Sequence, residues 1–80
     1  MRIDKFLKNS RIIKRRSVAK EACDSQRVMI NGKVAKAGSE VAVGDRIDIE
    51  FGNNSISVMV DALLDSAKKD DAVNMYHAIN

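Results

Sequence analysis

The spacing of apolar residues changes once along this chain, near residue 27. Over residues 2–15 the apolar side chains recur at helical spacing, and Ser17 suits the N-cap of a second helix that runs to about residue 24 or 25. Beyond the change, apolar and polar residues alternate, which is typical of strands with one buried face. These signals predict the α+β fold class, with two N-terminal helices followed by an antiparallel sheet that has one solvated face.

The two helices are expected to meet almost without a linker. The basic run Lys14-Arg15-Arg16 predicts the end of the first helix, where cations suit the helix dipole. Ser17 then begins the second helix, and this corner would bring the basic run close to Lys20. The apolar stripe of the second helix is Val18, Ala19, Ala22 and Cys23.

Turn signals divide the alternating region into hairpins. Asn31-Gly32 is a strong hairpin signal and predicts that residues 27–36 form two short paired strands. A second hairpin is expected to pair residues 46–51 with residues 56–60. In the first of those strands, the side chains expected to face the core are Ile47, Ile49 and Phe51.

The end of the chain carries a weaker signal. Ser66 is expected to cap a short helix that runs through Met75, and residues 76–79 either continue this helix or pair with the sheet. The apolar positions of this helix are Ala67, Ala72, Val73 and Met75.

Charge is distributed very unevenly along the chain. Residues 1–36 contain eleven Lys or Arg and three acids, a net charge of +8, whereas residues 37–80 contain three bases and eight acids, a net charge of −5. Such a split, in a chain whose pI is about 9.2, is typical of a domain that binds a polyanion with its basic part. The alternative interpretation is a solvated charged face.

Residues suited to catalysis are scarce. His77 is the only histidine, Cys23 is the only cysteine, and the four glycines are isolated from one another. A catalytic triad, a zinc site or a phosphate-binding glycine loop needs partners that this sequence does not offer. We therefore expect no enzyme, no metal and no cofactor, and we expect Cys23 to be a buried structural thiol. Because no long apolar run or secretory signal occurs, we also expect no membrane span and a cytoplasmic protein.

Aromatic residues are too few for recognition by base stacking. Phe6, Phe51 and Tyr76 are the whole set, and the first two are expected in the core. Binders of single strands need exposed aromatic platforms, so the composition favours contact with the phosphates and the shape of folded RNA. With about five bases engaged, the logarithm of affinity should fall with the logarithm of salt concentration with a slope on the order of −4.

Six short segments, each weak alone, form a recognisable set: Arg2-Ile3-Asp4-Lys5-Phe6-Leu7, Lys14-Arg15-Arg16-Ser17, Ala19-Lys20, Arg27-Val28-Met29-Ile30-Asn31-Gly32, Lys36 and Val43-Gly44-Asp45. As a set they resemble the S-four RNA-binding domain, a family that recurs in pseudouridine synthases, tyrosyl-tRNA synthetases and heat-shock protein fifteen. The tail around Lys68-Lys69-Asp70-Asp71-Ala72 extends the likeness, and the chain is similar to the RqcP (YabO) branch of bacterial ribosome quality control.

The resemblance implies a fold in which two N-terminal helices pack on a small, mostly antiparallel sheet. Residues 1–60 are then expected to be the RNA-binding domain, and residues 61–80 a C-terminal extension packed on it.

The resemblance also implies a function. Proteins of this branch bind the large ribosomal subunit after it has separated from a stalled ribosome, contact its rRNA, and hold peptidyl-tRNA there. An RqcH-type tailing factor then delivers alanyl-tRNA for C-terminal alanine tailing of the nascent chain. The resemblance implies no catalysis by the small protein itself, and we expect a monomer away from the ribosome.

Matching the motifs residue by residue gives a set of expected RNA contacts. Arg16 is the first choice, because it ends the basic run and a guanidinium can bind phosphate through two parallel hydrogen bonds. Asn31 and Lys33 are expected beside the basic residues, at the edge of the hairpin. The full set is Arg2, Asp4, Lys8, Arg11, Lys14, Arg15, Arg16, Ser17, Lys20, Arg27, Asn31 and Lys33.

Two positions need separate mention. Asp4 is an acid among bases, so it is expected to orient Arg2, Lys8 or Arg16, to accept a bond from a base or ribose, or to complement the helix dipole. Gln26 stands where the family usually has glycine, so the turn before Arg27 is expected to differ.

Two other functions remain open at this point. One is a heat-shock-type rescue factor for free large subunits, which shares the domain. The other is a general nucleic-acid-binding module without a ribosomal role.

Overall fold

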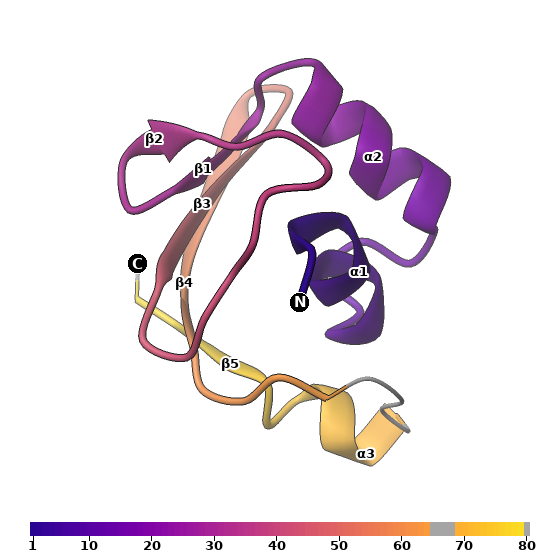
Figure 1. The fold of residues 1–80 in the computed structure, drawn as a ribbon, viewed down its shortest axis with the longest axis vertical. Helices are drawn as coiled ribbons and strands as arrows, with labels where there is room; N and C mark the ends of the chain where they lie inside the picture. Colours follow the sequence, from indigo (N-terminus) through magenta and orange to yellow (C-terminus); the bar gives the residue numbers. More distant parts are fainter. Residues whose placement is uncertain (65–68, 80) are drawn as a thin grey trace.

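Two helices cover one face of a five-stranded antiparallel sheet in the computed structural model, which describes residues 1–64 and 69–79 (Figure 1). The strands lie in the order β2-β1-β3-β4-β5, and each neighbouring pair is antiparallel. The elements in chain order are α1 (Ile3–Asn9), α2 (Arg16–Asp24), β1 (Val28–Ile30), β2 (Lys33–Val34), β3 (Arg46–Phe51), β4 (Asn54–Val60), α3 (Lys69–Ala72) and β5 (Tyr76–Ala78). The expected α+β class is confirmed. Among the described residues, no helix has the length and apolar character that crossing a bilayer requires.

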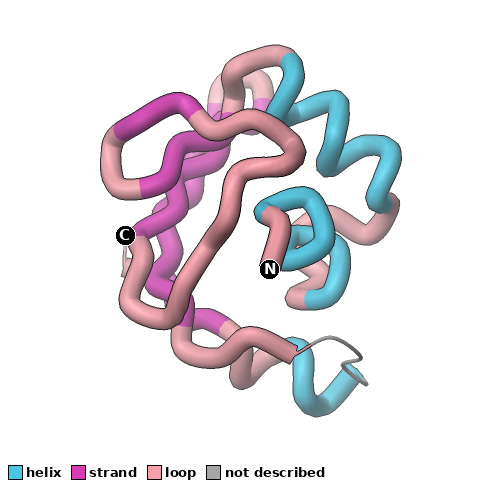
Figure 2. The backbone as a smooth tube through the Cα atoms, viewed as in Figure 1, coloured by secondary structure: helices cyan, strands magenta, loops and turns pink. Residues whose placement is uncertain are grey.

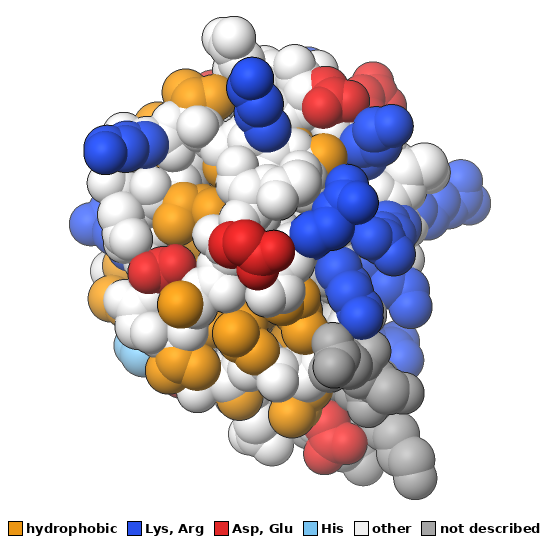
Figure 3. Space-filling view, in the orientation of Figure 1, with side chains coloured by type: hydrophobic (Ala, Val, Ile, Leu, Met, Phe, Trp, Pro, Cys, Tyr) orange, Lys and Arg blue, Asp and Glu red, His pale blue; other side chains and the backbone are white. Residues whose placement is uncertain are grey.

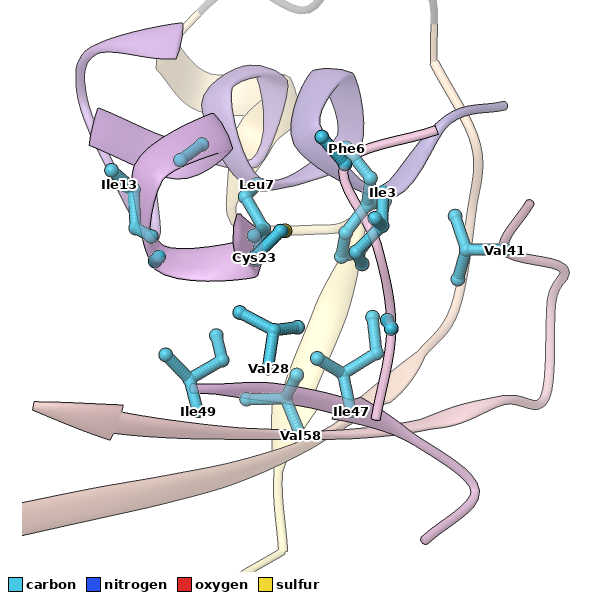
Figure 4. Close-up of a cluster of buried hydrophobic side chains, with 14 of the residues drawn as sticks. Ile3, Phe6, Leu7, Ile13, Cys23, Val28, Val41, Ile47, Ile49 and Val58 are labelled. Atoms are coloured by element: carbon cyan, nitrogen blue, oxygen red, sulfur yellow. The ribbon is translucent and has the colours of Figure 1, made fainter. Parts of the chain in front are cut away.

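The core lies between the helix pair and the sheet (Figure 4). Ile3, Phe6 and Leu7 point from α1 toward the sheet and are fully buried. The side chains that meet them from the sheet are Val28, Ile47, Ile49 and Val58. Burying a large apolar side chain in this way stabilises the fold by about 1.5–3 kcal/mol relative to leaving it exposed. The apolar face of α1 is therefore fixed inward, and its charged face is left toward solvent.

The first helix is shorter than the apolar spacing suggests. It ends at Asn9, and Arg11 adopts a left-handed conformation with φ of 63°. The N–H of Arg11 donates to the carbonyl of Lys8 at 3.1 Å, so the chain turns out of the helix. Residues 10–15 form a connection, and the expected direct join between the helices is wrong. Ile13 is buried because it packs from this connection, although its spacing imitates another helical turn.

The second helix begins at Arg16, so Ser17 lies inside its first turn. The prediction that Ser17 is the N-cap is wrong, because that position is occupied by Arg15, whose backbone is extended and whose side chain makes no capping bond. The helix ends at Asp24, as expected. Its apolar stripe is buried except for Val18, which is 45% exposed.

Gln26 takes the left-handed conformation that glycine usually supplies after a helix. Its φ is 63°, and its N–H donates to the carbonyl of Cys23 at 3.0 Å. The N–H of Arg27 reaches back to the carbonyl of Ala22 at 3.0 Å, which completes a Schellman motif. The expectation of a different turn is therefore wrong: the same turn is made with a residue for which a left-handed backbone is costly.

Both predicted hairpins are present, but three details are wrong. The strand expected to reach residue 36 ends at Val34, and the strand expected to begin at residue 56 begins at Asn54. The third concerns the burial of Phe51. Asn31 and Gly32 both have positive φ and connect β1 to β2, as the hairpin signal indicates. In β3, Ile47 and Ile49 are fully buried, but Phe51 is 41% exposed. Phe51 is the last residue of the strand and lines a pocket with Val18 and Ala22 of α2. Alternation therefore predicts its face correctly, but the expected burial is wrong.

The end of the chain joins the sheet. Residues 76–78 form β5 beside β4, so pairing with the sheet is the correct alternative for this segment. α3 ends at Ala72 instead of reaching Met75, and Val73 is 67% exposed instead of packing on an apolar side. Met75 itself is fully buried. The expected cap at residue 66 and the apolar position at residue 67 lie outside the described residues.

Candidate nucleic-acid interface

Exposed cations gather over the helix pair. Figure 3 shows Lys and Arg side chains massed over α1 and α2, with acidic side chains fewer and at the margin of the group. We call this area the basic helix-pair surface. Its exposed residues are Arg2, Lys8, Arg11, Lys14, Arg15, Arg16 and Lys20. The structure therefore places seven exposed cations of the expected set on the helix pair, its start and its connection.

Most of these cations make no ion pair with a carboxylate that the structure describes. Of the seven, only Arg2 and Arg16 do so, and both pair with Asp4. The guanidinium groups of Arg11 and Arg15 and three ammonium groups are thus exposed without a described ionic partner, an arrangement that raises the local concentration of anions.

Asp4 lies beneath the basic helix-pair surface and joins its two helices. Its side chain is 3% exposed, while those of Arg2 and Arg16 are 50% and 52% exposed. One carboxylate oxygen, Oδ2, lies 3.3 Å from Nη2 of Arg2 and 3.7 Å from Nε of Arg16. The other, Oδ1, accepts the backbone N–H of Lys5 at 2.8 Å. Of the three bases that Asp4 was expected to orient, it contacts Arg2 and Arg16; it makes no ion pair with Lys8.

The connection between β2 and β3 fixes the start of α1. Figure 2 shows this loop leaving β2, approaching α1 and returning to β3. The N–H of Ile3 donates to the carbonyl of Ser39 at 2.8 Å, and the N–H of Asp4 donates to the carbonyl of Ala37 at 3.4 Å. The guanidinium of Arg2 passes close to Gly38. Residues distant in the sequence therefore hold the basic N-terminus in place.

Ser17 and Arg27 lie at opposite ends of α2. Ser17 is exposed in the first turn, beside Arg16. Arg27 lies beyond the last residue of the helix, and it lines a pocket with Val18 and Phe51. Because Val18 belongs to the first turn, this pocket extends along α2 toward the end of the helix that carries Arg16.

Asn31 and Lys33 are not brought to the helix pair. The side chain of Asn31 accepts the N–H of Arg46 at 2.9 Å and donates to Asp45 at 3.1 Å, so it fastens the hairpin to the start of β3. Lys33 is exposed on the edge strand β2, which Figure 1 places across the molecule from α1. The expectation that both lie beside the basic residues is wrong, because the hairpin turn points away from the helices.

Several acids of the C-terminal half are used within the fold. Asp45 accepts the N–H of Ala42 at 2.8 Å, and Asp61 lies 2.8 Å from the ring Nδ1 of His77. Asp48 accepts the hydroxyl of Ser57 and pairs with Arg46 at 3.3 Å. Because these carboxylates are bonded to groups outside the helix pair, they do not neutralise the basic helix-pair surface.

Two residues near the candidate site were missed. Lys36 is exposed in the loop that holds the start of α1, two positions before Gly38. The sequence offered a signal for it, because Lys36 belongs to the set of short segments that resembles the family. Phe51 was assigned to the core, yet it is an exposed aromatic beside Arg27. No sequence signal distinguishes a strand end that is covered from one that is not.

The thiol of Cys23 is suited to packing and not to nucleophilic chemistry. It is 2% exposed, as expected for a structural cysteine. Burial, followed by the negative charges of Asp4 and Asp24, raises the pKa of Cys23 to about 11. A thiol needs a lowered pKa to react readily at neutral pH. Asp4 therefore also places a negative charge close to the core under the helix pair.

Comparisons with known proteins agree with this arrangement. The family model described as "S4 domain" matches residues 1–47. Over 76 residues the chain is 53% identical to a Bacillus subtilis protein named "RQC P-site tRNA stabilizing factor", covering 95% of this chain and 88% of that protein. A protein of the same name from Streptococcus pneumoniae is 50% identical over 80 residues, covering 100% of this chain and 91% of that protein.

A solved structure has the same fold. The trimeric structure of Heat Shock Protein 15 from Vibrio cholerae superposes with a TM-score of 0.91 at 26% identity, covering 99% of this chain and 81% of that one.

Proposed function

We propose a function from one premise, that the chain belongs to the S4 domain family and is related to proteins named RQC P-site tRNA stabilizing factor. It is an RNA-binding factor of ribosome quality control. It binds the rRNA of a free large ribosomal subunit and, on that subunit, holds peptidyl-tRNA. It acts by binding and performs no chemistry of its own.

The basic helix-pair surface is the observation that carries this proposal. Its cations come from two helices and their connection, and together they form one side of a domain with principal extents of 28, 25 and 22 Å. Arginine and lysine side chains presented together contact phosphates of a backbone and release its counterions. No aromatic residue belongs to this surface, so contact with phosphate and shape is favoured over base stacking.

We propose that the cations of the basic helix-pair surface contact the RNA, and that Arg16 lies at the centre of this contact. Arg2 is the N-cap residue of α1 and Arg16 begins α2, and their guanidinium groups share one carboxylate. Two guanidinium groups at this spacing suit the oxygens of a phosphate, because each offers parallel N–H donors. Lys8, Arg11, Lys14, Arg15 and Lys20 extend the contact along the backbone.

Holding peptidyl-tRNA gives the protein its place in the reaction sequence. A nascent chain left on a free large subunit is extended at its C-terminus only while its tRNA stays bound. We propose that the chain keeps this tRNA in place while an RqcH-type tailing factor delivers alanyl-tRNA, and that the ribosome makes the peptide bonds. The names of the B. subtilis and S. pneumoniae relatives support this role.

A second candidate function is rescue of free large subunits by a heat-shock-type factor. The TM-score of 0.91 with the V. cholerae Heat Shock Protein 15 favours it. The two candidates use the same surface and differ in outcome, because a rescue factor clears the subunit whereas a tailing factor prolongs its occupation.

Reconstitution distinguishes them. Large subunits carrying peptidyl-tRNA are incubated with the chain, the tailing factor and alanyl-tRNA, and products are resolved by gel. The proposal predicts co-sedimentation of the chain with the subunits and longer alanine tails. Release of peptidyl-tRNA would support the rescue factor, and equal affinity for random duplex DNA and rRNA would support a general binding module.

A further inference from the structure

We infer that Asp4 is a positioning residue for RNA binding: its buried carboxylate holds Arg2 and Arg16 in one orientation, so removing this negative charge weakens binding to a polyanion. The inference rests on the proposed function. It runs against simple electrostatics, which predicts that removal of any acid near a cationic surface strengthens its attraction for phosphate.

Burial of Asp4 is the first observation behind this inference. A carboxylate that is 3% exposed must be compensated by hydrogen bonds or by opposite charge. Asp4 has both: Oδ1 accepts the N–H of Lys5, and Oδ2 faces the two guanidinium groups. An acid that only complemented the dipole of α1 could remain exposed to solvent and would not need to lie beneath Arg2 and Arg16.

The geometry of the two arginines is the second observation. Arg2 approaches Oδ2 through Nη2, while Arg16 approaches the same oxygen through Nε. Arg2 donates a hydrogen bond to Asp4, Arg16 forms an ion pair with it, and each side chain remains half exposed to solvent. The N–H donors that do not face Asp4 are left for a ligand.

Fixing these side chains has a direct consequence for affinity. A free arginine loses rotamer freedom when it is immobilised, and a side chain already held by a buried partner loses less on binding. Arg15, next to Arg16 in sequence, is exposed and makes no ion pair with a described carboxylate. The structure therefore distinguishes two oriented arginines from neighbours that are charged and unrestrained.

The test uses paired variants of the full chain and a defined probe. Asp4→Asn removes the charge and keeps the size of the side chain, while Glu21→Gln removes one exposed acid of α2 as the matched control. Affinity is measured by anisotropy for a fluorescein-labelled RNA hairpin, and by co-sedimentation with purified large subunits. We expect Asp4→Asn to bind the hairpin about tenfold more weakly and Glu21→Gln to bind about twofold more tightly.

A third variant separates positioning from structure. In an Arg2→Ala/Arg16→Ala background at low salt, Asp4→Asn should no longer weaken binding and should strengthen it slightly, since only charge remains to act. If Asp4→Asn strengthens binding in the native background, the inference is wrong. If it weakens binding equally in both backgrounds, Asp4 is merely structural and the inference is also wrong.

A measurement on the unchanged chain covers the case in which Asp4→Asn does not fold. Nitrogen relaxation of the arginine Nε–H groups should show Arg16 restrained and Arg15 mobile. Equal mobility of the two would overturn the inference. If the native chain does not bind large subunits while the hairpin results hold, the proposed function fails and the role of Asp4 in RNA binding stands.

Discussion

Charged side chains serve different purposes in the two parts of this domain. Over the helix pair, the cations are exposed, and in the part of the chain that the structure describes those that form an ion pair share the buried acid Asp4. Around the sheet, Asp45, Asp48 and Asp61 bind backbone or side-chain donors of their own domain. Charge that is satisfied internally stabilises a fold, whereas charge left facing solvent is available to a partner. We therefore expect the acids around the sheet to stabilise the fold and the bases of the helix pair to bind RNA.

The largest expected effect is on binding, from Arg16→Glu. Reversing this charge should weaken co-sedimentation with large subunits by at least about a hundredfold, because an oriented donor is replaced by a repulsive acid. The variant should stay folded but melt at a lower temperature, since the new carboxylate faces the buried carboxylate of Asp4, so binding is compared well below its melting temperature. Lys33→Glu makes the same charge change on the edge strand and serves as the control. The comparison fails if the two variants lose the same affinity.

The next effect is on stability, from Asp45→Ala. Its carboxylate accepts the N–H of Ala42 and the amide of Asn31, so its loss should lower the free energy of unfolding by about 1–2 kcal/mol. Urea denaturation measures this change. Glu21→Ala, an exposed acid of α2, should stay within about 0.5 kcal/mol of the native chain. A large loss of RNA affinity in folded Asp45→Ala would contradict the division between the two regions.

The free energy of unfolding should depend on pH because of Cys23, which is buried beneath the basic helix-pair surface. The pKa of Cys23 is raised from 9.0 to about 11, so the unfolded chain loses this proton at lower pH than the folded one. The free energy of unfolding should therefore fall as pH rises from about 9 to 11, by roughly 1 kcal/mol at pH 10. Unfolding of the native chain and of Cys23→Ala is compared across this range. Identical pH profiles would contradict the raised pKa.

The smallest effect is a gain in stability from Gln26→Gly. A left-handed backbone costs a residue with a side chain about 1–2 kcal/mol, and part of this gain is offset by the greater freedom of glycine in the unfolded chain. The net increase in the free energy of unfolding should be about 0.5–1 kcal/mol, measured by urea denaturation. RNA affinity should stay unchanged, because Gln26 lies outside the basic helix-pair surface. A loss of stability would show that the Gln26 side chain has a role of its own.

Periodicity and turn chemistry carry most of the fold. The alternation of β3 predicted its limits and its buried isoleucines, and Asn31-Gly32 predicted the first hairpin. The end of α1 was missed because Arg11 adopts a left-handed backbone that glycine more often marks, while Ile13 prolongs the helical spacing. The pairing of β5 with β4 was open because a three-residue strand carries too little pattern to separate it from a helix end.

The candidate site was predictable in composition and less so in geometry. A basic run and a helix pair are visible in the sequence, and they do meet on one surface. The positions of Asn31 and Lys33 depended on the direction in which a hairpin turn points, which no local pattern specifies. The joint contact of Arg2 and Arg16 with Asp4 depends on how α1 and α2 pack against each other. The sequence alone therefore left three roles open for Asp4, whereas the structure shows its carboxylate paired with these two arginines.

The salt dependence of binding to purified large ribosomal subunits tests the central claim most directly. If the exposed bases of the helix pair engage RNA phosphates, the logarithm of affinity should fall against the logarithm of salt concentration with a slope of about −4, and Arg16→Glu should make that slope shallower. A slope near zero for the native chain, or an unchanged slope in Arg16→Glu, would contradict the account.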